Sequence, residues 1–514
     1  MEFLSTIWSI IVFLLVLTTI ISIHELGHFL LARRAKILIH EFAIGMGPVI
    51  TQKKKGDTFY SLRAIPLGGF VSMSGENGDF QLIKKNQFIG LNLNEVGLIK
   101  EIILDNTIPN PSVTGKVLDF DLYGENLKEL FIEIETQNGE INRYQVLRNA
   151  KYRFQKKKEM QLTPHESSFA SKSLWDRFLV IFCGPLMNFI LALAVLFIVA
   201  AVQGKPLEHN IVDESSNPGL KAGDVILEIN GTPTQDIYEI RNALSNVVSN
   251  KVLVKLERDG IILEEVQEVY VIVIMQNFGL LNTMDPLTRD TLTIGGVGGK
   301  AKAAGIKPLD VITHINNQPV TSWDEIITLA RNYEQDQITV TVNRNGETIT
   351  ASYDVLSEST LNAIGEVMID VRLGFSVGNA FDFGYLFTYP FQQFGQSVVE
   401  MVATLGLLFN PSSEVGVGDL AGPVGIFSLV TNAASAGFVN LLIFVAFLSV
   451  NIGLFNLLPI PALDGGRLIF LGYEAITRKK VPAKVELWVN NAFFFLLMAL
   501  FVFVTFNDIG RLFS

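Results

Sequence analysis

Four long stretches of this sequence contain no charged residue, and they constrain its fold more than any other feature does. They cover residues 3–23, 178–204, 420–463 and 487–507. A helix needs about 20 apolar residues to cross the hydrocarbon of a bilayer, so the first, second and fourth stretches each fit one crossing. The third is longer, and Gly422, Pro423 and Gly425 near its start predict a loop at membrane depth before a crossing at 437–458. The sequence therefore predicts a polytopic α-helical membrane protein with four transmembrane helices.

Basic residues predict how these helices are oriented. They follow the first stretch, precede the second and lie between the third and fourth: Arg33, Arg34, Lys36, Lys172, Arg177, Arg478, Lys479 and Lys480. By the positive-inside rule these three regions are cytoplasmic, and the N-terminus, the segment 205–420 and the C-terminus face outward. No small-residue cleavage site follows the first stretch, so we expect it to be retained rather than removed as a signal peptide. The predicted location is a multi-pass protein of the cell membrane.

Charge and cysteine content exclude two further classes. The net charge of −11 argues against a nucleic-acid partner. The single cysteine, Cys183, lies within an apolar stretch, which excludes a disulfide framework. We interpret Cys183 as a small buried hydrophobic side chain.

A metal-binding pattern stands at the end of the first apolar stretch. Residues 24–28 read His-Glu-Leu-Gly-His, and positions i and i+4 of a helix share one face, so His24 and His28 can bind one ion with Glu25 beside it. In zinc hydrolases such a glutamate takes a proton from the attacking water and passes it to the leaving amine. A chance match is the alternative. Ionisable side chains next to a membrane segment are costly without a partner, and this favours the functional interpretation.

A catalytic zinc needs a third protein ligand and one open position. Asp464 is the best candidate, because it follows the third predicted crossing at the same membrane depth as His24 and His28. An aspartate after a helix is often a cap or turn residue, and Gly465 fits that reading too. The other histidines suit the role less well, since two lie in the outward segment and two in polar cytoplasmic stretches where a solvated or turn role is expected: His209, His314, His40 and His165.

With these motifs the sequence resembles the bacterial site-2 protease family, which are intramembrane zinc metalloproteases with tandem PDZ domains. His24, Glu25 and His28 match the first family motif, and Asp464 with Gly465 matches the second. Met46 departs from the aromatic that the family usually has there, and the stretch 76–170 is longer than in many relatives. Further matches are residues 42–48, 65–70 and 421–426, and Gly184 and Pro185 with Asn188.

The resemblance implies one Zn²⁺ per chain on His24, His28 and Asp464, with Glu25 as the catalytic base. It implies substrates that are single-span membrane proteins, such as anti-sigma factors, already trimmed on their outer side. Asn456 and Asn188 would hold the substrate backbone or the developing oxyanion. The alternative for these two is hydrogen bonding to neighbouring helices.

A short segment after the zinc motif is expected to contact the substrate. Residues 65–74 alternate weakly after Gly68 and Gly69, which predicts a short hairpin that dips toward the active site. A substrate helix satisfies its own backbone hydrogen bonds, so an enzyme must offer an unwound strand replacement partners. An edge strand does this, and the hypothesis places Gly68 and Gly69 at the substrate-binding surface.

The outward segment contains an internal repeat. Residues 219–260 and 305–346 align without a gap at an offset of 86, and each copy reads as strand, turn, helix, strand and hairpin turn. The pattern resembles two extracytoplasmic PDZ-like α/β domains. They would act as peptide receptors or as a size filter that excludes untrimmed proteins.

The expected organisation follows from these features. An amphipathic helix is expected near 380–410, at the outer membrane surface rather than across it. The segments are a first transmembrane helix with the zinc motif and the hairpin (1–75), a small cytoplasmic β-rich insert (76–173), a second transmembrane helix (174–204), a first and a second PDZ-like domain (205–285 and 286–375), the amphipathic segment (376–419), and the third and fourth transmembrane helices (420–470 and 471–514).

Two other functions fit part of the sequence. A membrane scaffold would use the PDZ-like domains without proteolysis, but it needs neither the metal ligands nor the base. A transporter or channel fits four crossings and a large outward module poorly. The sequence therefore favours an intramembrane zinc metalloprotease.

Overall fold

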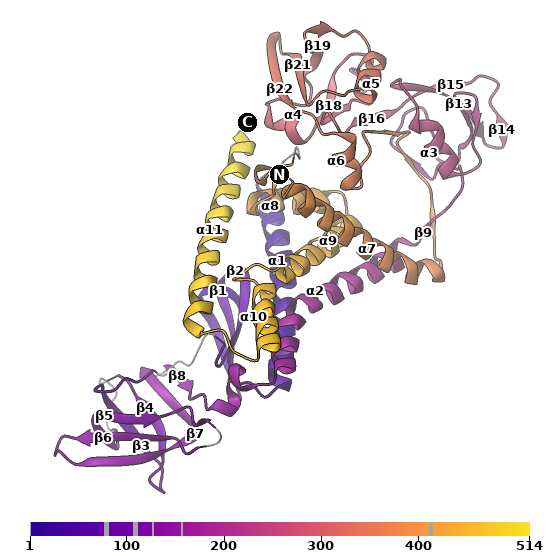
Figure 1. Cartoon of the computed structure of the whole chain (residues 1–514). Helices are drawn as coiled ribbons and strands as arrows, with labels where there is room; N and C mark the ends of the chain where they lie inside the picture. The colour runs from indigo at the N-terminus through magenta and orange to yellow at the C-terminus, as the bar shows by residue number, and fades with distance from the viewer. Residues whose placement is uncertain are drawn as a thin grey trace. The chain divides into compact units, whose positions relative to one another are not determined.

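The computed structural model describes residues 2–76, 82–105, 111–125, 128–155, 158–410 and 415–513. Within these residues, four helices are long and apolar enough to cross a membrane. They are α1 (Glu2–Arg34), α2 (Leu174–Gln203), α9 (Phe438–Leu457) and α11 (Ala483–Phe513), as Figure 1 shows. The shortest, α9, has 20 residues and thus spans about 30 Å, the thickness of the hydrocarbon. The four predicted crossings are confirmed as helices of sufficient length and hydropathy.

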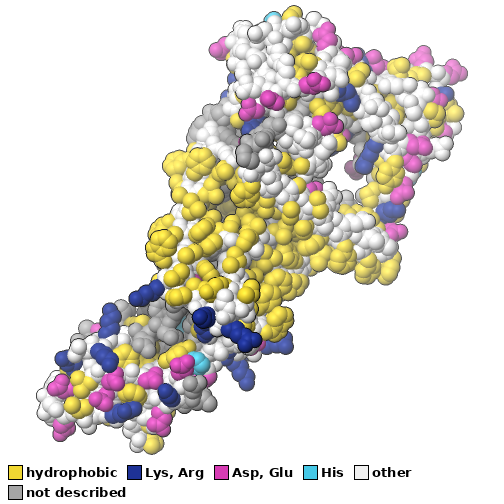
Figure 2. Space-filling view, in the orientation of Figure 1, with side chains coloured by type: hydrophobic (Ala, Val, Ile, Leu, Met, Phe, Trp, Pro, Cys, Tyr) yellow, Lys and Arg dark blue, Asp and Glu magenta, His cyan; other side chains and the backbone are white. Residues whose placement is uncertain are grey.

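The surface of these helices is that of a membrane protein. Figure 2 shows hydrophobic side chains gathered over the long helices, with Lys and Arg side chains where this apolar surface ends. Trp8, Trp175 and Trp488 are each more than 60% exposed, a surface that a soluble protein rarely presents. The chain is therefore a multi-pass membrane protein.

The prediction of a loop before the third crossing is wrong. Residues Pro423–Ser435 form a helix, α8, which ends shortly before α9 begins. Proline is tolerated at the first helical position because its missing N–H would have no partner there. Pro423 therefore starts a helix here instead of preventing one.

Internal contacts divide the chain into two compact units. The first comprises Met1–Ala194, Val430–Ala436 and Phe444–Ala499, and the second comprises Val195–Leu429, Gly437–Ile443 and Leu500–Ser514. The first unit contains the zinc motif and Asp464. The second contains the repeat.

Small residues allow close helix packing in the first unit. A Cβ on Gly27 would lie 2.2 Å from the carbonyl oxygen of Cys183, so α1 and α2 touch through backbone at this point. Ser449 of α9 donates a hydrogen bond to the carbonyl oxygen of Asn188 at 2.8 Å. These contacts fix α1 and α9 against α2.

A twisted antiparallel sheet follows α1. It is formed by β1 (Ile39–Lys55) and β2 (Thr58–Met73), and Ile39–Ile44 pairs both with 59–62 and with 69–73. The second half of β2 is therefore an edge, with no further strand paired to it among the described residues. Thr18 of α1 donates to the carbonyl oxygen of Pro66 at 2.7 Å and ties this edge to the helix. The prediction of a short hairpin at 65–74 is wrong, because most of this stretch belongs to one strand, β2, of a longer hairpin formed with β1.

The insert between β2 and α2 is a small closed barrel. Its sheet order is β4-β3-β5-β6-β7-β8, and the parallel pairing of β4 with β7 closes the ring. Its core is apolar, with Ile89, Leu91, Ile132 and Ile134 fully buried. The strands are β3 (Phe88–Leu93), β4 (Ile99–Ile103), β5 (Val113–Asp121), β6 (Phe131–Thr136), β7 (Ile141–Gln155) and β8 (Lys158–Gln161), and two 3₁₀ turns, His165–Ser167 and Phe169–Ser171, lead to α2.

The repeat in the second unit has the predicted order of elements. The first copy contains β11 (Val225–Ile229), β12 (Thr232–Pro233), α3 (Ile237–Ser245) and β13 (Lys251–Arg258). The second contains β19 (Val311–Ile315), β20 (Gln318–Pro319), α5 (Trp323–Arg331) and β21 (Gln337–Arg344). Arg258 pairs with Asp224 at 2.7 Å, and Arg344 pairs with Asp310 at the same distance. The two copies, related by an offset of 86 residues, therefore share the same arginine–aspartate ion pair with a buried aspartate.

Shorter elements complete both units. Helix α7 (Phe383–Leu408) occupies the expected amphipathic segment and is not among the helices that could span a membrane. The others are β9 (Lys205–Pro206), β10 (Glu214–Ser215), β14 (Ile261–Ile262), β15 (Gln267–Tyr270), β16 (Ile272–Met275), β17 (Leu280–Asn282), β18 (Ile294–Val297), α4 (Gly299–Ala303), β22 (Glu347–Asp354), α6 (Glu358–Ala363), β23 (Ile369–Arg372), β24 (Phe375–Ser376), β25 (Asn379–Ala380), a 3₁₀ turn at Val417–Asp419, and α10 (Asp464–Thr477).

Candidate active site

The end of α1 presents both histidines of the zinc motif on one face. The Nε2 atoms of His24 and His28 lie 3.2 Å apart, and both side chains are buried. Glu25 follows His24 on the same turn. The helix continues through this motif to Arg34, so the spacing of four residues becomes a fixed pair of facing imidazoles.

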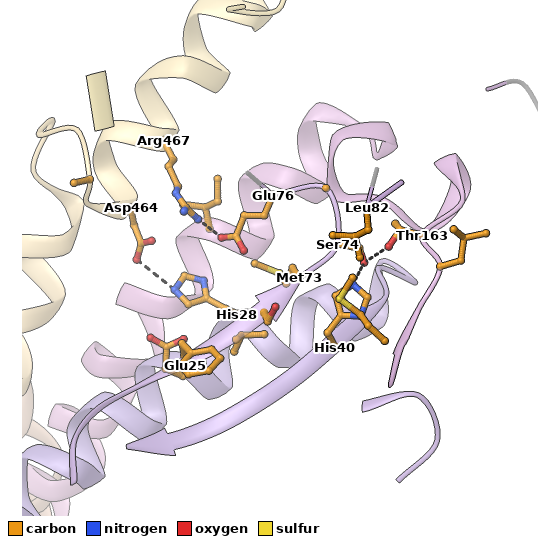
Figure 3. A pocket seen from close by; sticks show the side chains of 18 of the residues that line it. Glu25, His28, His40, Met73, Ser74, Glu76, Leu82, Thr163, Asp464 and Arg467 are labelled. Carbon is orange, nitrogen blue, oxygen red and sulfur yellow. Dashed lines mark hydrogen bonds and ion pairs between the residues drawn. The ribbon is translucent and has the colours of Figure 1, made fainter. Parts of the chain in front are cut away.

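Asp464 comes to the same point from the start of α10. Its Oδ2 lies 3.1 Å from Nε2 of His24 and 3.4 Å from Nε2 of His28, and Figure 3 shows it facing His28. The chain turns sharply before it, and a Cβ on Gly465 would lie 2.1 Å from the carbonyl oxygen of Leu458. Only glycine permits so close an approach between α10 and the end of α9.

Contacts from α2 orient the two imidazoles. Nδ1 of His28 lies 2.8 Å from the carbonyl oxygen of Val180, which can only accept, so His28 carries its proton on Nδ1. Its Nε2 lone pair then points toward His24 and Asp464. Asn188 Nδ2 lies 3.4 Å from Nδ1 of His24. A partner on the far ring nitrogen is the usual outer support of a metal-binding histidine.

These three side chains fit a zinc ion. Their ligand atoms all lie within 4.8 Å of one another. Asp464 Oδ2 faces only the two imidazole nitrogens at 3.1 and 3.4 Å among the described residues, so a cation held between the three groups would balance its charge. Two imidazole nitrogens and one carboxylate oxygen, with a position left open, are a donor set of catalytic zinc.

Gly184 makes room for the pair of rings. A Cβ on this residue would lie 2.3 Å from Nε2 of His28 and 3.0 Å from Cε1 of His24. No larger residue fits without moving the imidazoles. The sequence matched Gly184 to the family pattern but did not reveal this packing role.

Glu25 lies between the histidines and the edge strand. A Cβ on Gly69 would lie 3.5 Å from Cγ of Glu25, which places β2 directly against the side chain. Gly68 has φ of +109° and lies next to the side chain of Met46. The structure thus brings Gly69 next to Glu25, whereas Gly68 contacts Met46 and not the predicted catalytic residues. Asn456 donates to the carbonyl oxygen of Ile452 at 3.0 Å and lines a cavity at this site.

A cavity of about 690 Å³ opens at this site. It is lined by all four predicted catalytic and ligand residues, by residues 70–76 of β2 and the turn after it, and by Arg467. Arg467 makes an ion pair with Glu76 across the cavity wall, as Figure 3 shows. The sequence did not reveal this pair. The position of Arg467 three residues after Asp464 was a usable signal for a role near the site.

Two further polar contacts were also missed. Arg177 of α2 pairs with Glu474 of α10 at 2.6 Å, and both side chains are largely buried. His40 was expected to be solvated or in a turn, but it lies in β1 and its Nε2 is 2.6 Å from Oγ of Ser74. Burial lowers the pKa of His40 to about 4, so its imidazole is neutral at pH 7.

Comparison with known proteins points to one family. The profile of peptidase family M50 matches residues 12–500. The chain is 31% identical over 511 residues to the zinc metalloprotease RasP of Shouchella clausii, covering 98% of this chain and 100% of that one. It is 29% identical over 507 residues to the regulator of sigma-W protease RasP of Bacillus subtilis, covering 98% and 99%. Among solved structures, an HtrA-type protease AlgW with decapeptide matches at 13% identity over 58% of this chain and 66% of that one, with a TM-score of 0.12, too low to bear on the fold.

Proposed function

The chain belongs to peptidase family M50 and is a zinc metalloprotease, and from this premise we propose that His24, His28 and Asp464 hold the zinc and that Glu25 is the catalytic base. The observation that carries the proposal is the convergence of the three ligand atoms, two imidazole nitrogens and one carboxylate oxygen, within 4.8 Å of one another. A scaffold without proteolytic activity would need none of these contacts.

The residues around the ligands have distinct roles in this proposal. Zinc, when bound, would polarise the scissile carbonyl and lower the pKa of a water molecule, so that the water can lose a proton near neutral pH. Glu25 takes the proton from the attacking water and delivers it to the leaving amine. Asn188 is a positioning residue, because its amide lies 3.4 Å from Nδ1 of His24 and it is not among the residues that line the cavity in the described part of the chain. Asn456 lines the cavity and is the better candidate for contact with the substrate or the oxyanion.

The edge of β2 supplies the substrate with backbone partners. Peptide carbonyls in a transmembrane helix are already hydrogen-bonded, so the substrate must unwind before cleavage. The second half of β2 has a free edge, and Gly69 in this part of the strand lies next to Glu25. An unwound substrate strand that pairs here would pass the catalytic residues in extended form.

Sidedness follows from the basic residues. The insert and the active site are cytoplasmic, because Arg33, Arg34 and Arg177 flank the inner ends of α1 and α2. The repeat is extracytoplasmic and forms two PDZ-like domains over 205–285 and 286–375. They would exclude untrimmed proteins or bind the new chain end. Substrates are single-span membrane proteins, and the name of the Bacillus subtilis relative supports anti-sigma factors among them.

Metal content tests the proposed ligand set. Purified wild-type protein is expected to hold about one zinc per chain. Asp464→Ala and His28→Ala should each lose most of it, whereas Glu25→Gln should keep it because Glu25 is not a ligand. Equal zinc in wild type and Asp464→Ala would remove Asp464 from the site.

A further inference from the structure

The active-site cavity extends well beyond the catalytic residues. Figure 3 shows Glu25, His28 and Asp464 at one end and Leu82, Thr163 and His40 at the other, with Met73 and Glu76 between them. Consecutive residues of β2 and its following turn line this path from Phe70 to Glu76. The cavity therefore runs along the free edge of the strand that faces Glu25.

The far end of the cavity is built by the barrel insert. Its side chains there are large and mostly apolar, and the insert residues are Leu82, Leu122, Tyr123, Tyr152, Phe154, Met160 and Leu162. Phe154 and Met160 are only half-buried, so their surfaces are available to a ligand. An apolar hollow with a few polar groups at its rim is the usual form of a side-chain binding pocket.

Hydrogen bonds hold the insert against the end of β2. Ser74 Oγ lies 2.7 Å from Oγ1 of Thr163, and the carbonyl oxygen of Ser74 accepts from the backbone N–H of Phe169 at 2.7 Å. The N–H of Leu38 donates to the carbonyl oxygen of Ser167 at 2.9 Å. The apolar hollow is thus fixed in register with the strand that faces Glu25.

Strand geometry relates the hollow to the cleavage point. Gly69 lies against Glu25, and Ser74 marks the insert end, five residues further along the chain. At about 3.3 Å per residue this separation is roughly 16 Å. A substrate strand paired along β2 would therefore reach the hollow with a residue about four or five positions from the scissile bond.

We propose that the insert forms a specificity pocket for a large apolar side chain of the substrate, about four or five residues from the scissile bond on the side that leaves the membrane toward the insert. The proposal rests on the proposed protease function and deepens it. It gives the barrel a role in choosing substrates, because Phe154 and Met160 contact the substrate at a point remote from the catalytic groups.

A substrate scan tests the pocket first. Full-length protein in liposomes is given a single-span substrate with Ala, Leu, Phe or Glu at each of the first seven positions on the insert side of the cleaved bond. One position near the fourth or fifth should favour Leu or Phe over Glu by about tenfold or more in kcat/KM. If the four side chains give equal rates at every one of the seven positions, the proposal is overturned. If the wild-type protein cleaves none of the substrates, the protease function itself is overturned.

An exchange of side chains separates substrate contact from a structural role. Met160→Lys should reverse the preference at that one position, so that Glu becomes better than Leu. If Met160→Lys loses zinc, Met160→Ala is the variant that tests the pocket. The smaller alanine enlarges the hollow, so the preference at this substrate position should shift from Leu toward Phe. Ile141→Ala is the matched control, because Ile141 lies on the same barrel, is 63% exposed and is outside the cavity lining. A preference that neither Met160 variant changes would contradict the proposal.

Discussion

At the scale of single residues, Gly184 is the glycine that packs directly against the imidazoles of both proposed histidine ligands. A Cβ there would overlap Nε2 of His28 at 2.3 Å. We expect Gly184→Ala to lower zinc affinity and cleavage by roughly 10- to 100-fold, as other disturbances of histidine orientation do. Zinc titration and cleavage rates measure the effect. Gly472→Ala is the control, since Gly472 has nothing within 4 Å of its Cβ position, and an equal effect of both changes would contradict the packing argument.

The proximity of the three proposed ligand residues could be predicted from sequence because two simple regularities apply to them. His24 and His28 are four residues apart on one helix, and Asp464 lies at the end of a predicted crossing, which sets its depth. The ion pair between Glu76 and Arg467 joins residues 391 positions apart, and neither membrane depth nor periodicity marks Glu76. Contacts of this kind depend on tertiary packing that no local pattern encodes.

At the scale of elements, the free edge of β2 leads to a prediction about backbone donors. Proline removes one N–H, and successive N–H groups of a strand point to opposite sides. A proline placed in turn at each position from Gly69 to Met73 should therefore act with a period of two. Proline at a position whose N–H donates to β1 should destabilise the protein. Proline at a position whose N–H points away from β1 should abolish cleavage while zinc is retained. Cleavage that survives at every outward position would exclude pairing with the substrate.

The two buried aspartates of the repeat predict a pH dependence. Burial alone would raise the pKa of Asp224, but hydrogen bonds from Arg258 and the backbone hold the pKa below 3.8. The same balance applies to the pKa of Asp310 beside Arg344. A depressed folded-state pKa stabilises the fold above the unfolded pKa of about 3.9, and this contribution is lost as the pH falls toward the folded value.

Hydrogen exchange of the full chain can follow the two copies separately. Between pH 6 and 3 we expect protection of β11 and β19 to fall in parallel, after correction for intrinsic rates. Arg258→Met should lower the exchange protection of β11 already at pH 6 and leave the protection of β19 unchanged, so that the second copy serves as the internal control. Equal behaviour of β11 in wild type and variant would show that the ion pair does not stabilise the first copy.

The order of helices and strands along the chain was more predictable than the pairing of distant strands that closes the barrel. Each copy of the repeat follows its local pattern, and the side chains of Asp236 and Ser322 cap the two helices by accepting from backbone N–H groups. The closed barrel could be predicted only as β-rich, because the pairing of β4 with β7 joins distant strands in parallel. Helix α8 was missed because the glycines and proline at its start read as a loop signal, although proline also begins helices.

At the scale of the whole molecule, sidedness can be tested with two cysteines in a Cys183→Ala background. Val96→Cys lies in the insert at a position that is 82% exposed, and Leu287→Cys lies in the second unit at one that is 89% exposed. In intact cells a membrane-impermeant thiol reagent should label Leu287→Cys and leave Val96→Cys unlabelled until the cells are opened. Labelling in the reverse pattern would invert the proposed orientation.

The central claim is that Glu25 performs proton transfer beside a zinc held by His24, His28 and Asp464. The most direct measurement compares wild type with Glu25→Gln in liposomes that contain a single-span substrate, with zinc determined in both. Gln has nearly the same shape as Glu but cannot accept the proton, so we predict loss of cleavage by at least about 100-fold with about one zinc per chain retained. Undiminished cleavage by a zinc-loaded Glu25→Gln protein would contradict the account.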